Sequence, residues 1–281
     1  MRTPMRTPPM SFALPPFGGA VKWLIFINAG IFILQLIVAR MDPVLYATIM
    51  DVFALIPRDV AHGFAWQLFT YAFLHGGLGH LFFNMLSIWF IGSRLEERWG
   101  TRQFVEFYLF CVFGAAVSSI AIAYMGILGL SPDVATIGAS GGFYGLLMAF
   151  GYLYSEAEMF MFPLPFMVKA KYIVGIAVFV AFASALGGGG NVAYVAHLGG
   201  LLFGFLYVRF LPRRGLSAGL SEAYYGTRNR YYRWKRRRAA RKFEVYMRNV
   251  DRSQYFDEYG NFREPTEDEK NSDNGESKWV N

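Results

Sequence analysis

Four polar residues, His80, Asn84, Ser140 and His197, lie in or at the edge of otherwise apolar stretches of the chain. Polar side chains are costly inside a membrane, so they are usually paired or functional there. A serine and a histidine that meet supply a nucleophile and a general base, the pair that acyl transfer requires. The N–H groups of Asn84 and His80 could bind a developing oxyanion. These residue types predict acyl-transfer chemistry, provided that the fold brings them together.

The elements that must position these residues are apolar helices. Of the 281 residues, 54% are hydrophobic and 17% are charged, whereas roughly 25% are charged in a typical soluble domain. Because a membrane helix needs about 20 predominantly apolar residues, we expect an all-α polytopic membrane protein with six transmembrane helices. The predicted spans, some of them short, cover residues 23–39, 78–92, 104–127, 137–154, 172–186 and 192–211.

The predicted domain organisation follows from these spans. Residues 1–20 form an N-terminal segment, residues 21–211 a membrane domain, and residues 212–281 a tail. Residues 42–77, too long for a tight turn, are expected to fold against the outer membrane face as an interfacial or re-entrant loop. Prolines interrupt any signal-peptide pattern in the first 20 residues, so the first span is expected to be retained.

Lysine and arginine residues determine the expected orientation. They lie before the first span and after the second, fourth and sixth, whereas the opposite side carries only Arg40 and Arg58. Both termini are therefore expected in the cytoplasm, and the second, fourth and sixth helices run inward from the outer face. The four polar residues lie near the starts of these helices. At 1.5 Å per residue, none should lie much more than about 10 Å below its helix start.

The tail changes charge along its length. Residues 213–248 contain twelve lysine or arginine residues against two acids, and residues 251–281 contain nine acids against four bases. The basic half fits a helix on an anionic lipid surface, although a topology anchor is the simpler interpretation. Nucleic acid is not an expected partner. The acidic half has a composition typical of disorder.

Each polar residue has a purely structural explanation when it is taken singly. His80 and Asn84 share a helix face at i and i+4 and could simply bridge helices. Ser140 is a residue common where membrane helices pack closely, and His197 could be a hydrogen-bonded core histidine. A serine and a histidine on neighbouring helices are harder to explain in this way.

Glycine spacing favours a meeting of the fourth and sixth helices. Gly141 and Gly145 follow Ser140, and Gly200 and Gly204 lie on the helix face of His197. Small residues allow helix backbones to approach closely. We therefore expect these two helices to pack through their glycines and to bring His197 towards Ser140.

The expected mechanism uses Ser140 as the nucleophile and His197 as the base. The Ser140 backbone N–H, at a helix N-terminus, would join Asn84 and His80 as oxyanion donors. No acid lies in the outer half of any predicted span, so the expected arrangement is a dyad. Tyr144, one turn after Ser140, could orient His197 by stacking. The chemistry needs no metal and no cofactor.

Three motifs together resemble the rhomboid family of intramembrane serine proteases: Gly138-Ala139-Ser140-Gly141, His80 with Asn84, and Ala196-His197-Leu198-Gly199-Gly200 followed by Gly204. The resemblance covers residues 66–211 and, by span count, reaches the first helix. It implies a six-helix bundle with a water-filled cavity that opens outward. It also implies a dyad of Ser140 and His197, an oxyanion site that includes His80, Asn84 and the Ser140 amide, and stacking of Tyr144 on His197.

The resemblance further implies single-pass membrane protein substrates, cut in or near the membrane. Glu97, Arg98 and Gly100 resemble the polar motif that ends the second helix of the family. Trp66 matches the first residue of a Trp-Arg pair in the outer loop, and Gln67 replaces the arginine. That departure concerns the anchoring of the loop, not the chemistry.

The absence of an organellar targeting segment and of a seventh span favours a bacterial inner-membrane form.

Two other classes of protein remain open. A rhomboid-like protein without protease activity would bind or escort membrane clients, although such relatives usually lack the serine or the histidine. A transporter or channel could use His80 and His197 as a proton relay. The absence of intramembrane carboxylates and of an evident repeat between the halves disfavours it.

Overall fold

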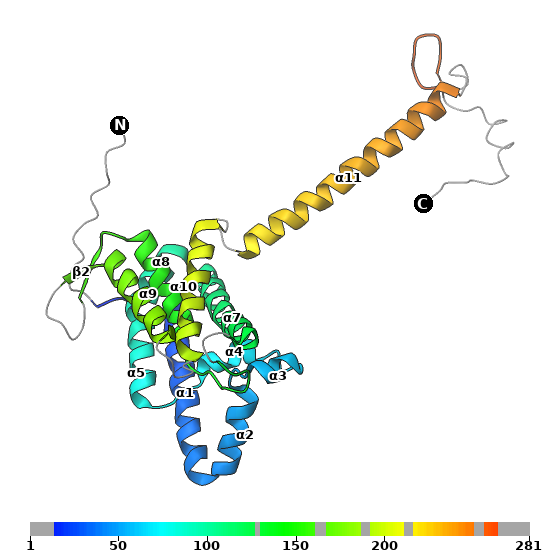
Figure 1. Ribbon diagram of the computed structural model, residues 1–281. Helices are drawn as coiled ribbons and strands as arrows, with labels where there is room; N and C mark the ends of the chain where they lie inside the picture. Colours follow the sequence, from blue (N-terminus) through cyan, green and yellow to red (C-terminus); the bar gives the residue numbers. More distant parts are fainter. Residues whose placement is uncertain are drawn as a thin grey trace. The chain divides into compact units, whose positions relative to one another are not determined.

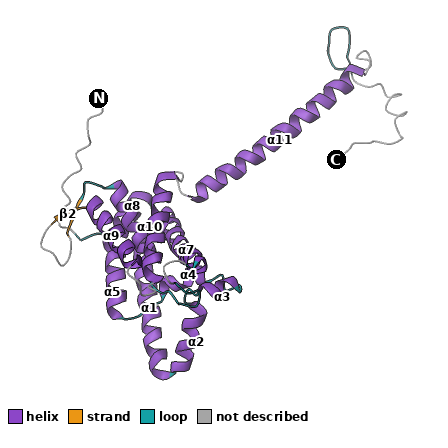
Figure 2. Ribbon diagram, viewed as in Figure 1, coloured by secondary structure: helices purple, strands orange, loops and turns teal. Residues whose placement is uncertain are grey.

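The computed structural model describes residues 14–126, 130–160, 167–186, 192–210, 216–249 and 256–263, and most of them are helical (Figure 2). The chain divides into two compact units, Met1–Gly219 and Leu220–Asn281. The elements are α1 (Gly19–Met41), α2 (Pro43–Phe53), α3 (Pro57–Ala61), α4 (Gln67–Thr70), the 3₁₀ helix η1 (Tyr71–Phe73), α5 (Leu78–Ser87), the π-helical turn η2 (Ile88–Gly92), α6 (Ser93–Trp99), α7 (Thr101–Met125), α8 (Ser140–Leu153), β1 (Glu158–Phe160), β2 (Met167–Lys169), α9 (Ala170–Leu186), α10 (Val192–Phe210) and α11 (Leu216–Asn249).

Each predicted span contains a helix, but not all of these helices are long enough to cross a bilayer. Within the described residues, α1, α7 and α10 have the length and apolar composition of a membrane span. A fourth crossing is counted if Gln67–Phe73 and Leu78–Trp99, which meet at 101°, form one broken span. Helices α8 and α9 have 14 and 17 residues. The chain is thus a helical membrane protein, and the count of six spans stays a prediction.

Helices α7, α8 and α10 lie side by side in the middle of the first unit (Figure 1). Large side chains of α7 and α8, such as Phe104, Phe107, Tyr108 and Leu146, are fully buried there. Helix α9 is peripheral by comparison, because only Ala170 and Ala181 are buried along it. The site residues carried by α8 and α10 therefore sit on the best-packed part of the molecule.

The start of α1 is held by a buried acid. Glu96 accepts hydrogen bonds from the backbone N–H groups of Ala20 (2.7 Å) and Val21 (3.0 Å). A carboxylate at a helix N-terminus satisfies unpaired donors and complements the helix dipole. Gly19, at φ +55°, lies so close to Glu96 that a side chain would collide with the carboxylate. Glu97, which the resemblance assigned to a structural motif, is exposed. Its Oε2 lies 3.6 Å from Arg94 Nη1.

Strands β1 and β2 form a short antiparallel pair between α8 and α9. Beside it, Glu156 bonds Lys169 (2.8 Å) and Lys171 (2.5 Å). These hydrogen bonds lower the pKa of Glu156 to about 2, and the bond with Lys169 has the larger effect. Outside the described residues lie most of residues 1–20, residues 161–166 and 187–191 on either side of α9, and most of the acidic end.

Candidate active site

Helix α8 begins at Ser140, three residues later than the apolar run suggests. Gly138 is the reason, because its φ of +117° lies in a region that favours glycine and is incompatible with a right-handed helix. Its N–H donates to the carbonyl oxygen of Tyr71 at 2.9 Å. The chain therefore turns sharply at Gly138 and presents Ser140 at the N-terminus of α8, where helix N–H groups lack intrahelical partners.

Ser140 and His197 are in hydrogen-bond contact across α8 and α10. Ser140 Oγ lies 2.8 Å from His197 Nε2. The ring of Tyr144 stacks on the His197 ring with centroids 4.1 Å apart and an interplanar angle of 16°. Within the part of the chain that the structure describes, His197 Nδ1 has no hydrogen-bond partner. The Tyr144 ring thus packs against the imidazole, and no acid among the described residues bonds His197 Nδ1.

His80 and Asn84 of α5 flank the turn that precedes Ser140. A methyl group at Gly138 would lie 2.7 Å from His80 Nε2 and 3.8 Å from Asn84 Nδ2. The Gly76 N–H points at His80 Nδ1 at 3.4 Å, so in the neutral ring Nδ1 is the acceptor and Nε2 carries the proton. Asn84 Nδ2 is buried and has no partner among the described residues. Two N–H donors therefore face the backbone beside Ser140.

His75 is a neighbour of this site that the sequence analysis did not single out. It is 2% exposed, and its ring meets the His80 ring edge-on at 5.1 Å. The Gln35 side chain of α1 holds the His75 backbone: Gln35 Oε1 accepts from the N–H (3.1 Å) and Nε2 donates to the carbonyl (3.4 Å). In the sequence, the short run His-Gly-Gly-Leu-Gly-His at residues 75–80 is the pattern that indicates a second histidine close to His80.

The glycines allow three helices to meet at the site. A side chain at Gly200 would collide with the Gly141 carbonyl, and one at Gly204 would lie 2.7 Å from the Gly145 carbonyl oxygen. The vacant side-chain positions of Gly141 and Gly145 face α7, against Ala115 and Cys111. Close backbone contact between α8 and α10 is what brings the Ser140 hydroxyl within reach of the imidazole.

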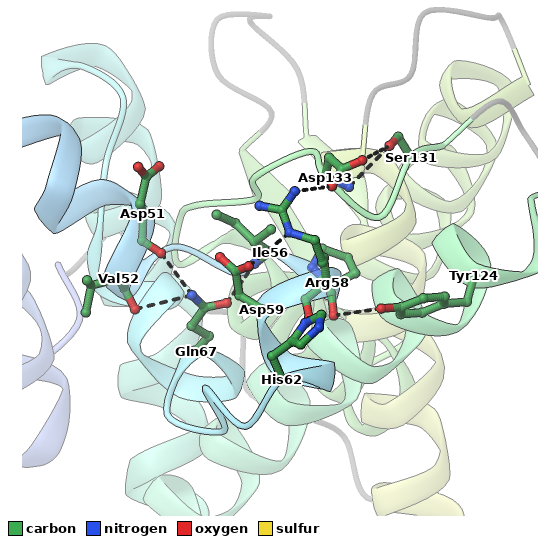
Figure 3. Close-up of polar contacts among 11 residues, drawn as sticks. Asp51, Val52, Ile56, Arg58, Asp59, His62, Gln67, Tyr124, Ser131 and Asp133 are labelled. Carbon is green, nitrogen blue, oxygen red and sulfur yellow. Dashed lines mark hydrogen bonds and ion pairs between the residues drawn. The ribbon is translucent and has the colours of Figure 1, made fainter.

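Gln67 anchors the outer loop from a fully buried position (Figure 3). Its Oε1 accepts from the Ile56 N–H at 2.9 Å, and its Nε2 donates to the carbonyl oxygens of Asp51 (3.0 Å) and Val52 (3.3 Å). The neighbouring Trp66 donates to the same Val52 oxygen at 2.8 Å. The amide therefore holds the loop with both a donor and an acceptor, whereas an arginine offers only donors.

A second set of contacts ties α3 to the loop that precedes α8 (Figure 3). The Arg58 N–H donates to the Pro132 carbonyl at 3.0 Å, and the Arg58 guanidinium pairs with Asp133 at 2.5 Å. The hydrogen bond with Asp59 and the charge of Asp133 raise the pKa of Arg58. Because Arg58 and Asp133 are mostly exposed, we expect their ion pair to add little stability.

These features define a helical membrane protein with a serine and a histidine in contact at the start of a central helix. A family profile described as Rhomboid domain matches residues 62–227. The match covers more than half of the chain, and the chain belongs to the rhomboid family.

Curated relatives support the same family. The chain is 33% identical over 147 residues to Rhomboid protein 1, mitochondrial, of Saccharomyces cerevisiae, covering 50% of this chain and 40% of that protein. It is 31% identical over 159 residues to Rhomboid protease GluP of Bacillus subtilis, covering 56% and 28%. It is 26% identical over 190 residues to Rhomboid-like protease 3 of Toxoplasma gondii, covering 67% and 68%. The chain thus spans less than half the length of the first two of these relatives.

Proposed function

We propose that this protein is an intramembrane serine endopeptidase that uses Ser140 and His197 as a catalytic dyad. The observation that carries the proposal is the 2.8 Å contact between Ser140 Oγ and His197 Nε2, with Tyr144 stacked on the imidazole. The protease names of two relatives support the same activity. A protein that only binds membrane clients would not need this pairing.

The acylation step follows from the contact. His197 Nε2 accepts the hydroxyl proton as Ser140 Oγ attacks the carbonyl carbon of the scissile peptide bond. The same nitrogen then gives the proton to the leaving amine, and the C–N bond breaks to leave an acyl-enzyme on Ser140. Water, deprotonated by His197, releases the acyl group and restores the hydroxyl.

The negative charge of each tetrahedral intermediate needs donors that are already in place. The Ser140 N–H, the Asn84 Nδ2 amide and the His80 Nε2 proton are the candidates. Asn84 suits this role because its buried amide lacks a partner in the described structure. Preorganised donors of this kind cost no reorganisation when the charge develops.

The expected substrates are single-pass membrane proteins, cut in or near the membrane segment. Membership of the rhomboid family and the apolar helices support an integral membrane protein. The positions of lysine and arginine favour cytoplasmic termini, and a bacterial inner membrane is the proposed location.

A serine-reactive probe and a substrate test the proposal together. The purified protein is incubated with a fluorophosphonate and, separately, with a single-pass membrane substrate. Wild type should label and cleave, whereas Ser140→Ala and His197→Ala should do neither. Ser118→Ala, on α7, is the matched control and should behave like wild type. Cleavage that survives Ser140→Ala would overturn the assignment of the nucleophile, and an inert wild type that still binds the substrate would favour a client-binding protein.

A further inference from the structure

Helix α11 carries a dense positive charge. Over Leu216–Asn249 it contains ten lysine or arginine residues and only two acids, Glu222 and Glu244. Like charges spaced at i and i+4 destabilise a helix. A helix of this composition is therefore expected to gain stability from an anionic partner.

The aromatic residues of α11 gather on one half of the helix. At 3.6 residues per turn, Tyr224, Tyr225, Tyr231, Tyr232 and Trp234 all project within about half of the circumference. The opposite half presents residues such as Arg230, Arg233 and Arg237. We call the first half the aromatic face.

The aromatic face is exposed although it is apolar. Each of its five rings is at least 49% exposed. An aromatic stripe on a helix of a soluble domain is ordinarily buried against a core, whereas these rings contact one another, as Tyr231 does with Tyr232 (5.6 Å) and Trp234 (6.1 Å). Among the described residues of the second unit, the stripe therefore lacks the cover that its composition predicts.

Cations lie among the rings. Arg228 lies 4.8 Å from the Tyr225 ring centroid, and Arg238 lies 5.4 Å from that of Trp234. Tyrosine and tryptophan are enriched where a protein meets the membrane–water interface. Long basic side chains can lie along an apolar surface and keep their charge at the level of the headgroups. The aromatic face thus combines the two residue classes that an anionic lipid interface binds.

The position of α11 in the chain places its start near a membrane. Helix α10 has the length and composition of a span, and α11 begins six residues after α10 ends. At no more than about 3.6 Å per residue, its first residue lies within about 22 Å of the end of α10. We propose that the aromatic face of α11 is a docking surface for the anionic lipid headgroups of the bilayer that α10 crosses.

Single-stranded nucleic acid is the competing partner, because aromatic rings and arginine also bind bases and phosphates. The short connection to a membrane helix favours the lipid surface. The proposal does not depend on the Ser140–His197 chemistry.

The test compares two adjacent alanines in the whole 281-residue chain. Ala239 lies within the aromatic half and Ala240 on the opposite half, and both are exposed. Each is changed to cysteine in a Cys111→Ser background, spin-labelled, and reconstituted in phosphatidylcholine vesicles with or without phosphatidylglycerol. Access of a water-soluble nickel chelate is measured by electron paramagnetic resonance. With phosphatidylglycerol, the label at position 239 should lose nickel access and the label at position 240 should keep it; in phosphatidylcholine alone both should keep it.

A second set of variants separates the contribution of the aromatic rings from that of the positive charge. Tyr231→Ser with Trp234→Ser should abolish the difference between the two labels, whereas the control Arg237→Gln, on the opposite half, should preserve it. Equal nickel access of both labels in anionic vesicles would overturn the proposal. So would protection at position 239 that appears only when a single-stranded oligonucleotide is added, since that result would assign α11 to nucleic acid.

Discussion

Leu55 and Thr136 exchange both of their backbone hydrogen bonds, at 3.0 and 2.9 Å, and so join the outer loop to the segment that carries Ser140. Thr136 precedes Ser140 by four residues. On the other side of the bridge, Ile56 is bonded to Gln67. The outer loop is therefore joined to the backbone four residues before Ser140, next to a residue that Gln67 holds in place, and the remote amide becomes relevant to the site.

Replacement of Gln67 by methionine should destabilise the protein. Gln67→Met preserves the approximate volume but leaves the buried Ile56 N–H without its acceptor, and removes the part-buried hydrogen bonds to the Asp51 and Val52 carbonyls. Each unsatisfied group of this kind costs about 1–3 kcal/mol. Thermal unfolding in detergent should show a lower midpoint than wild type and than the control Gln103→Met on α7, and Ser140 labelling should slow. An unchanged midpoint would contradict the anchoring role.

A methyl group at Gly138 should disrupt the oxyanion site. In Gly138→Ala the new carbon would lie 2.7 Å from His80 Nε2, so the ring must move. Loss of one oxyanion donor typically lowers the rate by about 10²–10³, and we expect a fall of that order in probe labelling. Gly126→Ala is the matched control, because Gly126 also has a positive φ (+67°) but has nothing within 4 Å of the added carbon. Equal effects of the two variants would show that backbone strain alone is responsible.

Asn84→Ala should affect turnover more than stability. Its Nδ2 has no hydrogen-bond partner in the described structure, so the folded protein loses little when the amide is removed. If this amide binds the oxyanion, kcat for a membrane substrate should fall roughly 10²–10³-fold. Asn28→Ala, which removes an amide that donates to the Leu24 carbonyl within α1, should leave kcat unchanged. A fall in the unfolding midpoint without a fall in kcat would assign Asn84 a structural role.

The pH dependence of stability should include a contribution from Glu156. Its pKa in the folded protein is about 2, below the ordinary value of 4.5, so the ionised form stabilises the fold. That contribution is fully present above about pH 4.5 and is lost as the pH falls towards 2. The unfolding midpoint of wild type should exceed that of Glu156→Gln near neutral pH, and the gap should close towards pH 2. A gap independent of pH would indicate that ionisation of Glu156 is not involved; Glu158→Gln, in β1, serves as the control.

Much of the arrangement was predictable from local pattern. Apolar runs located the helices, and the spacing of Gly200 and Gly204 after His197 indicated close packing of that helix. These features depend on residues near one another in the chain. Helix α8 starts at Ser140, where the sequence placed a helix N-terminus, although the apolar run around it begins at residue 137; the positive φ of Gly138 separates the two.

Contacts between distant segments could not be predicted in this way. Glu96 caps a helix by bonding the N–H of Ala20, 76 residues earlier, and Gln35 holds the backbone of His75 forty residues later in the chain. The sequence alone placed a hydroxyl and an imidazole at similar depths, because helix rise is uniform. Only the tertiary structure decided that the two are 2.8 Å apart and that the Gly76 N–H points at His80 Nδ1, because hydrogen-bond geometry depends on where separate segments come together.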